Sequence, residues 1–213
     1  DMTIGRAEAV SPAGTTTTTF SDGAFELARW DASSFGWGLG GSSVLAHSLT
    51  GGNPGEFLQI ENVLNAAPSP TARTEVLGVF INRSASYDPS TSRAISSLDY
   101  SEDAILLSGF GDGQLTGPVI EQEGRIYSFN QDNSIVANQA TWTVLEATGL
   151  TASDFSLVDP ALGEDASSQL LTGSHPDFSS TAPPLFFGFR RLNGVRAGGP
   201  GYQMTGGIDN WRV

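Results

Sequence analysis

The stretch Leu185-Phe186-Phe187-Gly188-Phe189 decides the fold class of this chain. Both its odd-numbered and its even-numbered positions include large apolar residues. A strand formed by this stretch would therefore present hydrophobic side chains on both faces. Such short apolar runs are typical of strands that are covered on both sides. We therefore expect a central strand over 184–192, at the core or at its border.

Patterns of period two surround this stretch and predict further strands. Apolar residues share one face at Leu58 and Ile60, at Leu77, Val79 and Ile81, and at Tyr127 and Phe129. The 26 Gly and 11 Pro interrupt the chain too often for long helices. The expected strands are 24–30, 35–46, 56–63, 76–82, 92–99, 104–109, 117–122, 124–130, 140–147, 184–192 and 202–213. One helical turn is expected after Thr151, and 159–183 is the longest expected irregular connection.

The length predicts a single domain. All-β sandwiches of about 200 residues routinely form one unit, and the chain has 213 residues. Residues 1–18 are small and polar and end in a threonine run, which indicates an N-terminal arm or leader strand. We assign 19–213 to one all-β domain.

The charge of the chain argues against several partners. The formal net charge is −13, and all 10 basic residues are arginines. Nucleic acids and anionic membranes attract clustered cations, so both are disfavoured as partners. No apolar stretch is long enough to span a bilayer, so we expect no membrane insertion. There is no cysteine, which excludes disulfides and thiolate metal sites.

Both ends of the chain resemble a known class of domains. Phe20-Ser21-Asp22-Gly23 with Trp30, and the closing Gly207-Ile208-Asp209-Asn210-Trp211-Arg212-Val213, resemble the first and last strands of concanavalin A-like jelly rolls and of carbohydrate-binding modules. Gly51-Gly52-Asn53-Pro54-Gly55, Thr148-Gly149-Leu150 and Phe187-Gly188-Phe189 look like parts of laminin-G-like domains of extracellular bacterial proteins. The resemblance implies a jelly-roll β-sandwich of two antiparallel sheets, with the first and last strands side by side and Asp22 paired with Asp209. It also implies a secreted or cell-surface location.

In carbohydrate-binding modules of this kind, the acidic residue of the closing stretch often joins a structural calcium site with groups from the first strand. The resemblance therefore implies calcium as a structural cofactor, with Asp22, Glu26 and Asp209 as ligands. Carboxylates supply the hard oxygens that calcium prefers. The alternative is that Asp22 opens a turn with Gly23 and that Asp209 caps a strand end through backbone hydrogen bonds.

Two patterns resemble catalytic motifs. Arg73-Thr74-Glu75-Val76 resembles a strand motif of jelly-roll alginate lyases, but the other groups that elimination requires are missing from this sequence. Glu121 and Glu123 share a strand face, as the carboxylates of sandwich glycosidases do, but no third acid follows. We therefore predict no catalytic residue.

Sugars bind by stacking on aromatic rings while polar side chains bond their hydroxyl groups. The predicted ligand-binding residues are Trp37, Arg83, Tyr87, Arg190 and Tyr202. The tyrosines and Trp37 adjoin turn or loop residues, and the arginines offer donors for acidic groups. Burial in the core is the alternative for each aromatic residue.

These observations lead to one predicted function and two alternatives. The prediction is a non-catalytic extracellular module that binds a polysaccharide or glycan or acts in surface adhesion, as a monomer or as part of a larger protein. The alternatives are a structural surface domain without a ligand and a polysaccharide-active lyase or glycosidase.

Overall fold

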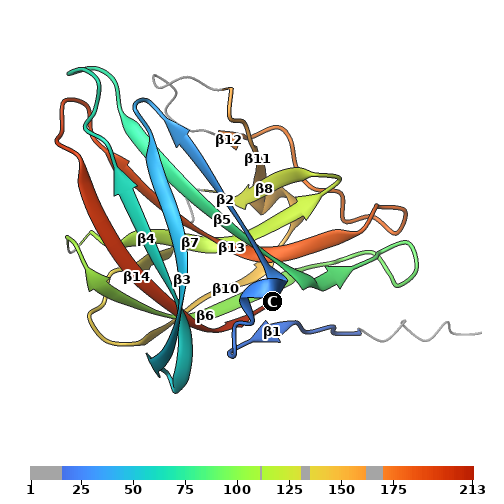
Figure 1. The fold of residues 1–213 in the computed structure, drawn as a ribbon. Coiled ribbons are helices and arrows are strands. Elements are labelled where there is room, and N and C mark those ends of the chain that lie inside the picture. The colour runs from blue at the N-terminus through green and yellow to red at the C-terminus, as the bar shows by residue number, and fades with distance from the viewer. Residues whose placement is uncertain (1–15, 111, 131–134, 162–169) are drawn as a thin grey trace, which may run out of the picture.

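The computed structural model describes residues 16–110, 112–130, 135–161 and 170–213. They form a jelly-roll β-sandwich of two antiparallel sheets (Figure 1). The six-stranded sheet has the order β10 (Thr143–Leu150), β6 (Leu98–Ser108), β14 (Tyr202–Arg212), β4 (Gly55–Leu64) and β3 (Gly41–Gly52), with β1 (Ser21–Asp22) beside β14. The eight-stranded sheet has the order β12 (Leu170–Leu171), β11 (Phe155–Val158), β8 (Arg125–Phe129), β7 (Gln114–Gln122), β13 (Leu185–Val195), β5 (Thr74–Tyr87) and β2 (Trp30–Trp37), with β9 (Ile135–Ala137) beside β7. The predicted fold class is confirmed.

The main core lies between the two sheets. Leu58 and Ile60 of β4 and Ile208 of β14 face Phe80 and Phe189 of the other sheet, and all five are fully buried. Phe80 and Phe189 stack with their ring centroids 4.8 Å apart. Burial of large apolar side chains stabilises the sandwich by about 1.5–3 kcal/mol each.

A second apolar layer covers the outer face of the eight-stranded sheet. Leu77, Val79 and Ile81 of β5 point to this face and pack with Val158 and Leu170 from the edge of the same sheet. The sheet is therefore buried on both sides. This explains why β13, which lies between β5 and β7, is apolar in both directions, and it confirms the predicted central strand.

The two ends of the domain meet, as the resemblance implied. β1 pairs antiparallel with β14, with Ser21 opposite Arg212 and Asp22 opposite Trp211. The expected pairing of Asp22 with Asp209 is therefore wrong by two residues. Trp30 and Trp211 pack edge to face at 5.1 Å beneath this pairing, so the contact between the ends is also part of the core.

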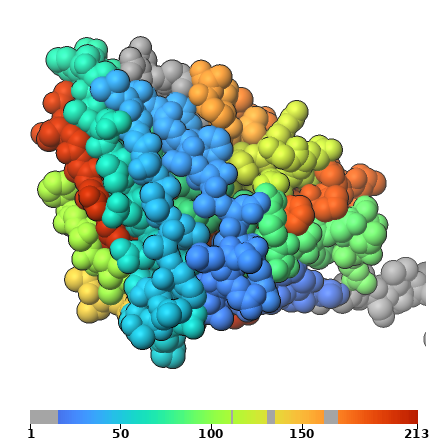
Figure 2. All heavy atoms as spheres, viewed as in Figure 1, coloured from blue at the N-terminus to red at the C-terminus, as the bar shows by residue number. Residues whose placement is uncertain are grey.

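Three predicted strands differ from the structure. Residues 27–29 form a helical turn, η1 (Leu27–Arg29), and 92–97 form a loop. The predicted strand 35–46 is broken because Gly38 and Gly40 have φ angles of 66° and 59°, which L side chains rarely adopt. The chain turns there from β2 to β3, which lie at the free edges of the two sheets. The blue and cyan atoms of these two strands cover much of the face seen in Figure 2.

The predicted helical turn after Thr151 is confirmed. It is η3 (Ala152–Asp154), and the Thr151 and Asp154 side chains form a reciprocal capping box. The predicted connection 159–183 contains the short strand β12, and its residues 162–169 lie outside the described part of the chain, as do 1–15 of the predicted arm. In the described residues, no helix has the length and apolarity needed to cross a membrane.

Candidate functional site

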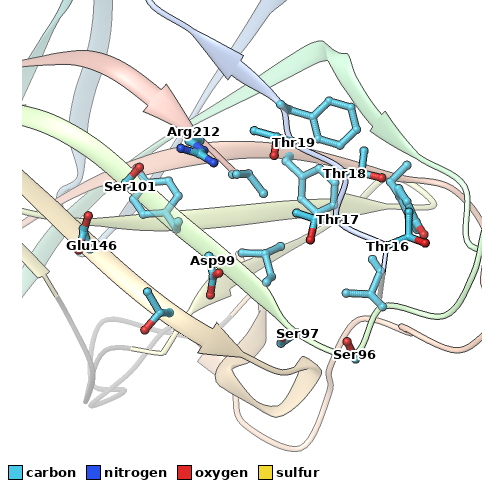
Figure 3. A pocket seen from close by; sticks show the side chains of 18 of the residues that line it. Thr16, Thr17, Thr18, Thr19, Ser96, Ser97, Asp99, Ser101, Glu146 and Arg212 are labelled. Atoms are coloured by element: carbon cyan, nitrogen blue, oxygen red, sulfur yellow. The ribbon is translucent and has the colours of Figure 1, made fainter. Parts of the chain in front are cut away.

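A pocket of about 410 Å³ opens at the end of the sandwich where the N-terminal arm meets the last strand (Figure 3). Thr16–Thr19 form one side, and Leu98–Ser101 and Glu146 contribute to the opposite side. Arg212 lies between them, since it pairs with Ser21 next to the arm and with Ser101 of β6. We call this the threonine pocket. Its size falls in the range of sites that take small ligands.

The pocket exists because two strands end at different positions. β14 stops pairing with β6 at Arg212 and Ser101, whereas β6 begins three residues earlier, at Leu98. The arm is held beside this gap by two backbone hydrogen bonds between Phe20 and Val213, of 2.8 and 2.9 Å. The pocket therefore occupies the space between β6 and the arm.

Several polar side chains of the pocket are uncommitted. In the described part of the chain, no residue forms an ion pair or hydrogen bond with the side chain of Glu146 or Arg212. The four threonine hydroxyls of the arm are exposed and have no partner among the described residues. Asp99 accepts one hydrogen bond, from the Gly149 backbone N–H at 2.7 Å. These groups can donate to and accept from a ligand without breaking bonds that hold the fold.

Rings and aliphatic side chains form the remaining wall. Phe20 packs on Phe187 with ring centroids 5.7 Å apart, and Tyr87 and Ile95 lie beside them in the lining. The Tyr87 hydroxyl donates to the Arg93 carbonyl at 3.0 Å, which fixes the ring. The pocket can therefore receive a ligand that has an apolar face and a hydroxyl-rich edge.

Of the predicted ligand-binding residues, Tyr87 lines the threonine pocket. Trp37 lies opposite Glu75 near the start of β5, whereas Tyr87 ends the same strand. About 40 Å of strand separates the two positions, since a strand rises about 3.3 Å per residue. Trp37 is also only 4% exposed, in the outer apolar layer. The predicted aromatic residues are thus not brought together in one groove.

The two predicted arginines are engaged within the protein. Arg83 donates to Asp31 at 2.6 Å and to both carboxylate oxygens of Glu121 at 2.9 Å, and its guanidinium lies over the Phe186 ring. The hydrogen bond to Glu121 is the main reason that the pKa of Arg83 is raised. Arg190 is buried and donates to the Ser128 hydroxyl, and burial lowers its pKa to about 10.

The engagement of Glu121 bears on the glycosidase alternative. The second carboxylate of the predicted pair, Glu123, lies in the turn after β7 with a φ of 53°. Gln122 between them donates to the Asp177 and Pro183 carbonyls. The first carboxylate of the pair thus orients Arg83, and the second belongs to a hairpin turn.

The predicted calcium ligands are engaged with other partners. Asp22 accepts from the backbone N–H groups of Ala24 and Phe25 and from Trp30 Nε1, at 2.7–3.1 Å. Glu26 pairs with Arg29 on the surface. Both carboxylate oxygens of Asp22 accept hydrogen bonds from N–H donors, which is the arrangement expected from the turn-forming alternative for Asp22.

Asp209 belongs to a cluster that sequence reasoning did not identify. Its carboxylate accepts from the backbone N–H groups of Asn53 and Asn210, at 2.5 and 2.7 Å. The amides of the same two asparagines donate to Asp103 on β6. Burial raises the pKa of Asp209, and the charge of Asp103 raises it further. In the described residues, no group of three or more His, Cys, Asp or Glu side chains could hold a metal. Calcium binding stays a prediction.

The sequence indicated some residues of the threonine pocket but not that they lie together. Arg212 belongs to the closing stretch that resembles the last strand of jelly rolls, and the threonine run indicates only an arm. Nothing in the sequence placed Glu146 beside Ser101, because their proximity depends on the register of β10 on β6. A register between two strands far apart in the sequence follows from tertiary packing.

Comparison with known proteins adds evidence on the fold. No protein-family model and no curated protein sequence matches the chain. Among solved structures, it is similar to the family 11 carbohydrate-binding module of the cellulosomal cellulase Lic26A-Cel5E of Clostridium thermocellum, with a TM-score of 0.50, 12% identity, and coverage of 93% of this chain and 95% of that one. A family 11 module from the same organism, in complex with a β-1,3-1,4-mixed-linked tetrasaccharide, matches with a TM-score of 0.48, 11% identity, and coverage of 93% and 96%. The first similarity supports the jelly-roll fold expected from the sequence.

Proposed function

We propose that this chain is a non-catalytic carbohydrate-binding module and that the threonine pocket is its binding site. The observation that carries the proposal is the composition of the pocket. Uncommitted hydroxyl, carboxylate and guanidinium groups face rings and aliphatic side chains across a space of about 410 Å³. The fold shared with a family 11 carbohydrate-binding module supports the same class of ligand.

The chemistry of sugars fits both walls of the pocket. A pyranose ring has C–H groups that pack on aromatic faces and hydroxyl groups that both donate and accept hydrogen bonds. Carboxylates such as Glu146 accept from hydroxyl groups, and a guanidinium such as Arg212 donates to them. Hydrogen bonds that involve charged groups are stronger than neutral ones.

The charges favour a neutral glycan. The pocket holds two carboxylates, Asp99 and Glu146, against one guanidinium, Arg212. Arg83 is engaged by two acids and Arg190 is buried, so neither is available for a uronate or sulfate group. The whole chain carries a formal net charge of −13, which repels anionic polymers.

We further propose that the module works outside the cell, alone or attached to a larger protein. Many structural polysaccharides are extracellular, and an acidic, cysteine-free chain suits that setting. A module of this kind could also attach a cell surface to glycans, because adhesion requires the same binding of carbohydrate.

Affinity gel electrophoresis against soluble polysaccharides tests the proposal. Neutral β-glucan, xylan and mannan are compared with alginate and pectin, and at least one neutral polymer should retard the native chain. Arg212→Ala should weaken binding about tenfold, which corresponds to one hydrogen bond to a charged group. Arg125→Ala is the matched control, because Arg125 is also an exposed strand arginine with no ion pair among the described residues.

Three outcomes would contradict the proposal. Retardation by none of the polymers would leave the structural surface domain as the better function. Equal binding by Arg212→Ala and Arg125→Ala would show that the binding site is not the threonine pocket. New unsaturated or reducing ends after incubation would show a lyase or a glycosidase.

A further inference from the structure

A pair of aromatic rings, one exposed and one half-buried, lies at the opposite end of β6 from the threonine pocket. Phe110 follows β6 and is 59% exposed. It packs against Tyr202, the first residue of β14, with ring centroids 5.4 Å apart and an angle of 72° between the planes. We call these two residues the Phe110–Tyr202 pair.

The pair is held in place from below. The Tyr202 hydroxyl donates to the Gly194 carbonyl on β13 at 3.1 Å. Its ring is half-buried against the cluster formed by Leu64, Val76 and Val195. Tyr202 is thus a fixed support against which Phe110 packs. A fixed support lowers the conformational entropy that is lost when a ligand stacks on the pair.

One carboxylate that could orient a ligand lies near the rings. Asp112 is close enough for its charge to add to the effect of burial, which raises the pKa of Tyr202. Gln203, the next residue of β14, points to the opposite face of the sheet, where it donates to Glu61 at 2.6 Å, so it is not part of this group. An exposed ring can stack on a sugar while a nearby carboxylate accepts hydrogen bonds from its hydroxyl groups.

The Phe110–Tyr202 pair does not contribute to the threonine pocket. β6 runs from Leu98 in the pocket to Ser108 next to Phe110. This span corresponds to about 33 Å of strand. A short oligosaccharide in the pocket would not reach the rings, whereas a polymer could contact both places.

We propose that Phe110 and Tyr202 form a second carbohydrate subsite, which stacks a sugar ring of a polymer whose other part occupies the threonine pocket. This inference rests on the proposed function. Two linked weak contacts raise the apparent affinity for a polymer well above that for a short ligand. The subsite therefore predicts a dependence on ligand length.

The test compares two probes, the neutral polysaccharide that retards the native chain and a short oligosaccharide cut from it. Phe110→Ala should weaken binding of the polymer about tenfold, as one lost stacking contact and its avidity predict, and should leave binding of the short probe unchanged. Leu49→Ala is the control, because Leu49 is 70% exposed and lies in neither site. Isothermal titration calorimetry gives the affinities, and thermal unfolding should show equal Tm values for native and variant chains.

The outcomes separate this inference from the proposed function. If Phe110→Ala binds the polymer as tightly as the native chain does, the proposal of a second subsite is wrong, but the proposal that the threonine pocket binds carbohydrate still stands. If Phe110→Ala weakens the short probe and Arg212→Ala weakens neither, the rings are the primary site, which contradicts the two-subsite arrangement. Loss of polymer affinity alone, with Arg212→Ala weakening both probes, supports it.

Discussion

The carboxylate of Glu102 lies 3.1 Å from the guanidinium of Arg191 between the two sheets, where neither side chain is exposed. The Tyr100 hydroxyl donates to the same carboxylate at 2.5 Å, and Arg191 also donates to Thr116. Burial raises the pKa of Tyr100 well above its ordinary value, and the charge of Glu102 adds to this effect. Two charges without solvent contact thus lie in a core that is otherwise largely apolar.

Glu102→Gln should strongly destabilise the fold. The substitution keeps the shape of the side chain but leaves the Arg191 charge buried without its counter-charge, which costs about 3–5 kcal/mol. For a chain of this length the melting temperature should fall by on the order of 10 °C. Differential scanning calorimetry measures the shift, and Tyr100→Phe, which removes one donor to the carboxylate, should cost less, about 1.5–3 kcal/mol.

The double variant Glu102→Leu with Arg191→Met tests the physical reason. Replacing both members of a buried pair by apolar side chains is often nearly neutral. Its Tm should therefore lie closer to that of the native chain than to that of Glu102→Gln. A Glu102→Gln Tm equal to the native one would contradict the importance of the pair.

The adjacent arginines show where sequence reasoning succeeded and where it failed. The apolar run before them correctly predicted that β13 is central. Successive side chains of a strand point to opposite faces, so Arg190 and Arg191 had to enter two different layers of a strand covered on both sides. The prediction that Arg190 is accessible to a ligand was wrong, because it did not take into account that both faces of β13 are covered. Because β13 is covered on both faces, Arg190 and Arg191 are both buried and at most 1% exposed.

Asp22→Ala should destabilise the junction between the ends of the domain. The Asp22 carboxylate accepts from Trp30 Nε1 at 2.9 Å, and Trp30 is only 6% exposed. Removal leaves this donor and the Phe25 N–H without their acceptor, at a cost of about 2–3 kcal/mol. The Tm should fall by about 5 °C or more, with a change in the near-ultraviolet circular dichroism of tryptophan.

Asp31→Ala is the comparison for this variant. Asp31 also lies in the first segments of the domain, but its ion pair with Arg83 is exposed to solvent. Such pairs contribute about 0–1 kcal/mol. A larger loss for Asp31→Ala than for Asp22→Ala would contradict a structural role of the Asp22 hydrogen bonds.

The candidate site was less predictable than the fold. Alternating apolar residues identify strands because burial depends on a local period of two, and Leu77, Val79 and Ile81 do share one face. The threonine pocket depends instead on the position at which β14 stops pairing with β6. That position depends on the register between two strands far apart in the sequence, which no local pattern encodes.

Calcium makes a separate prediction. If the ion binds the folded chain through Asp22, Glu26 and Asp209, a concentration of about 100 times its Kd adds about 2.7 kcal/mol of stability. The Tm in excess calcium should then exceed the Tm in chelator by about 5 °C or more, and Asp209→Asn should abolish the difference. Equal Tm values would show that the N–H donors around Asp22 and Asp209, rather than an ion, hold these carboxylates.

Asp209 should make the stability depend on pH in the direction opposite to most carboxylates. Its pKa is raised above the ordinary value of 3.8, first by burial and then by the charge of Asp103. Between 3.8 and the raised pKa, the folded chain therefore binds more protons at this site than the unfolded chain does. The contribution of Asp209 to the free energy of unfolding falls as the pH rises through this window.

Asp103→Asn isolates the effect of the neighbouring charge. The substitution removes the repulsion but leaves Asp209 buried, so the pKa of Asp209 should move toward its ordinary value without reaching it. Titration of the carboxyl carbon by NMR measures this shift directly. Asp88→Asn is the control, because Asp88 bonds only within its own turn. If Asp103→Asn left the pKa of Asp209 unchanged while the fold was intact, burial alone would account for the shift, and the two carboxylates would not be coupled.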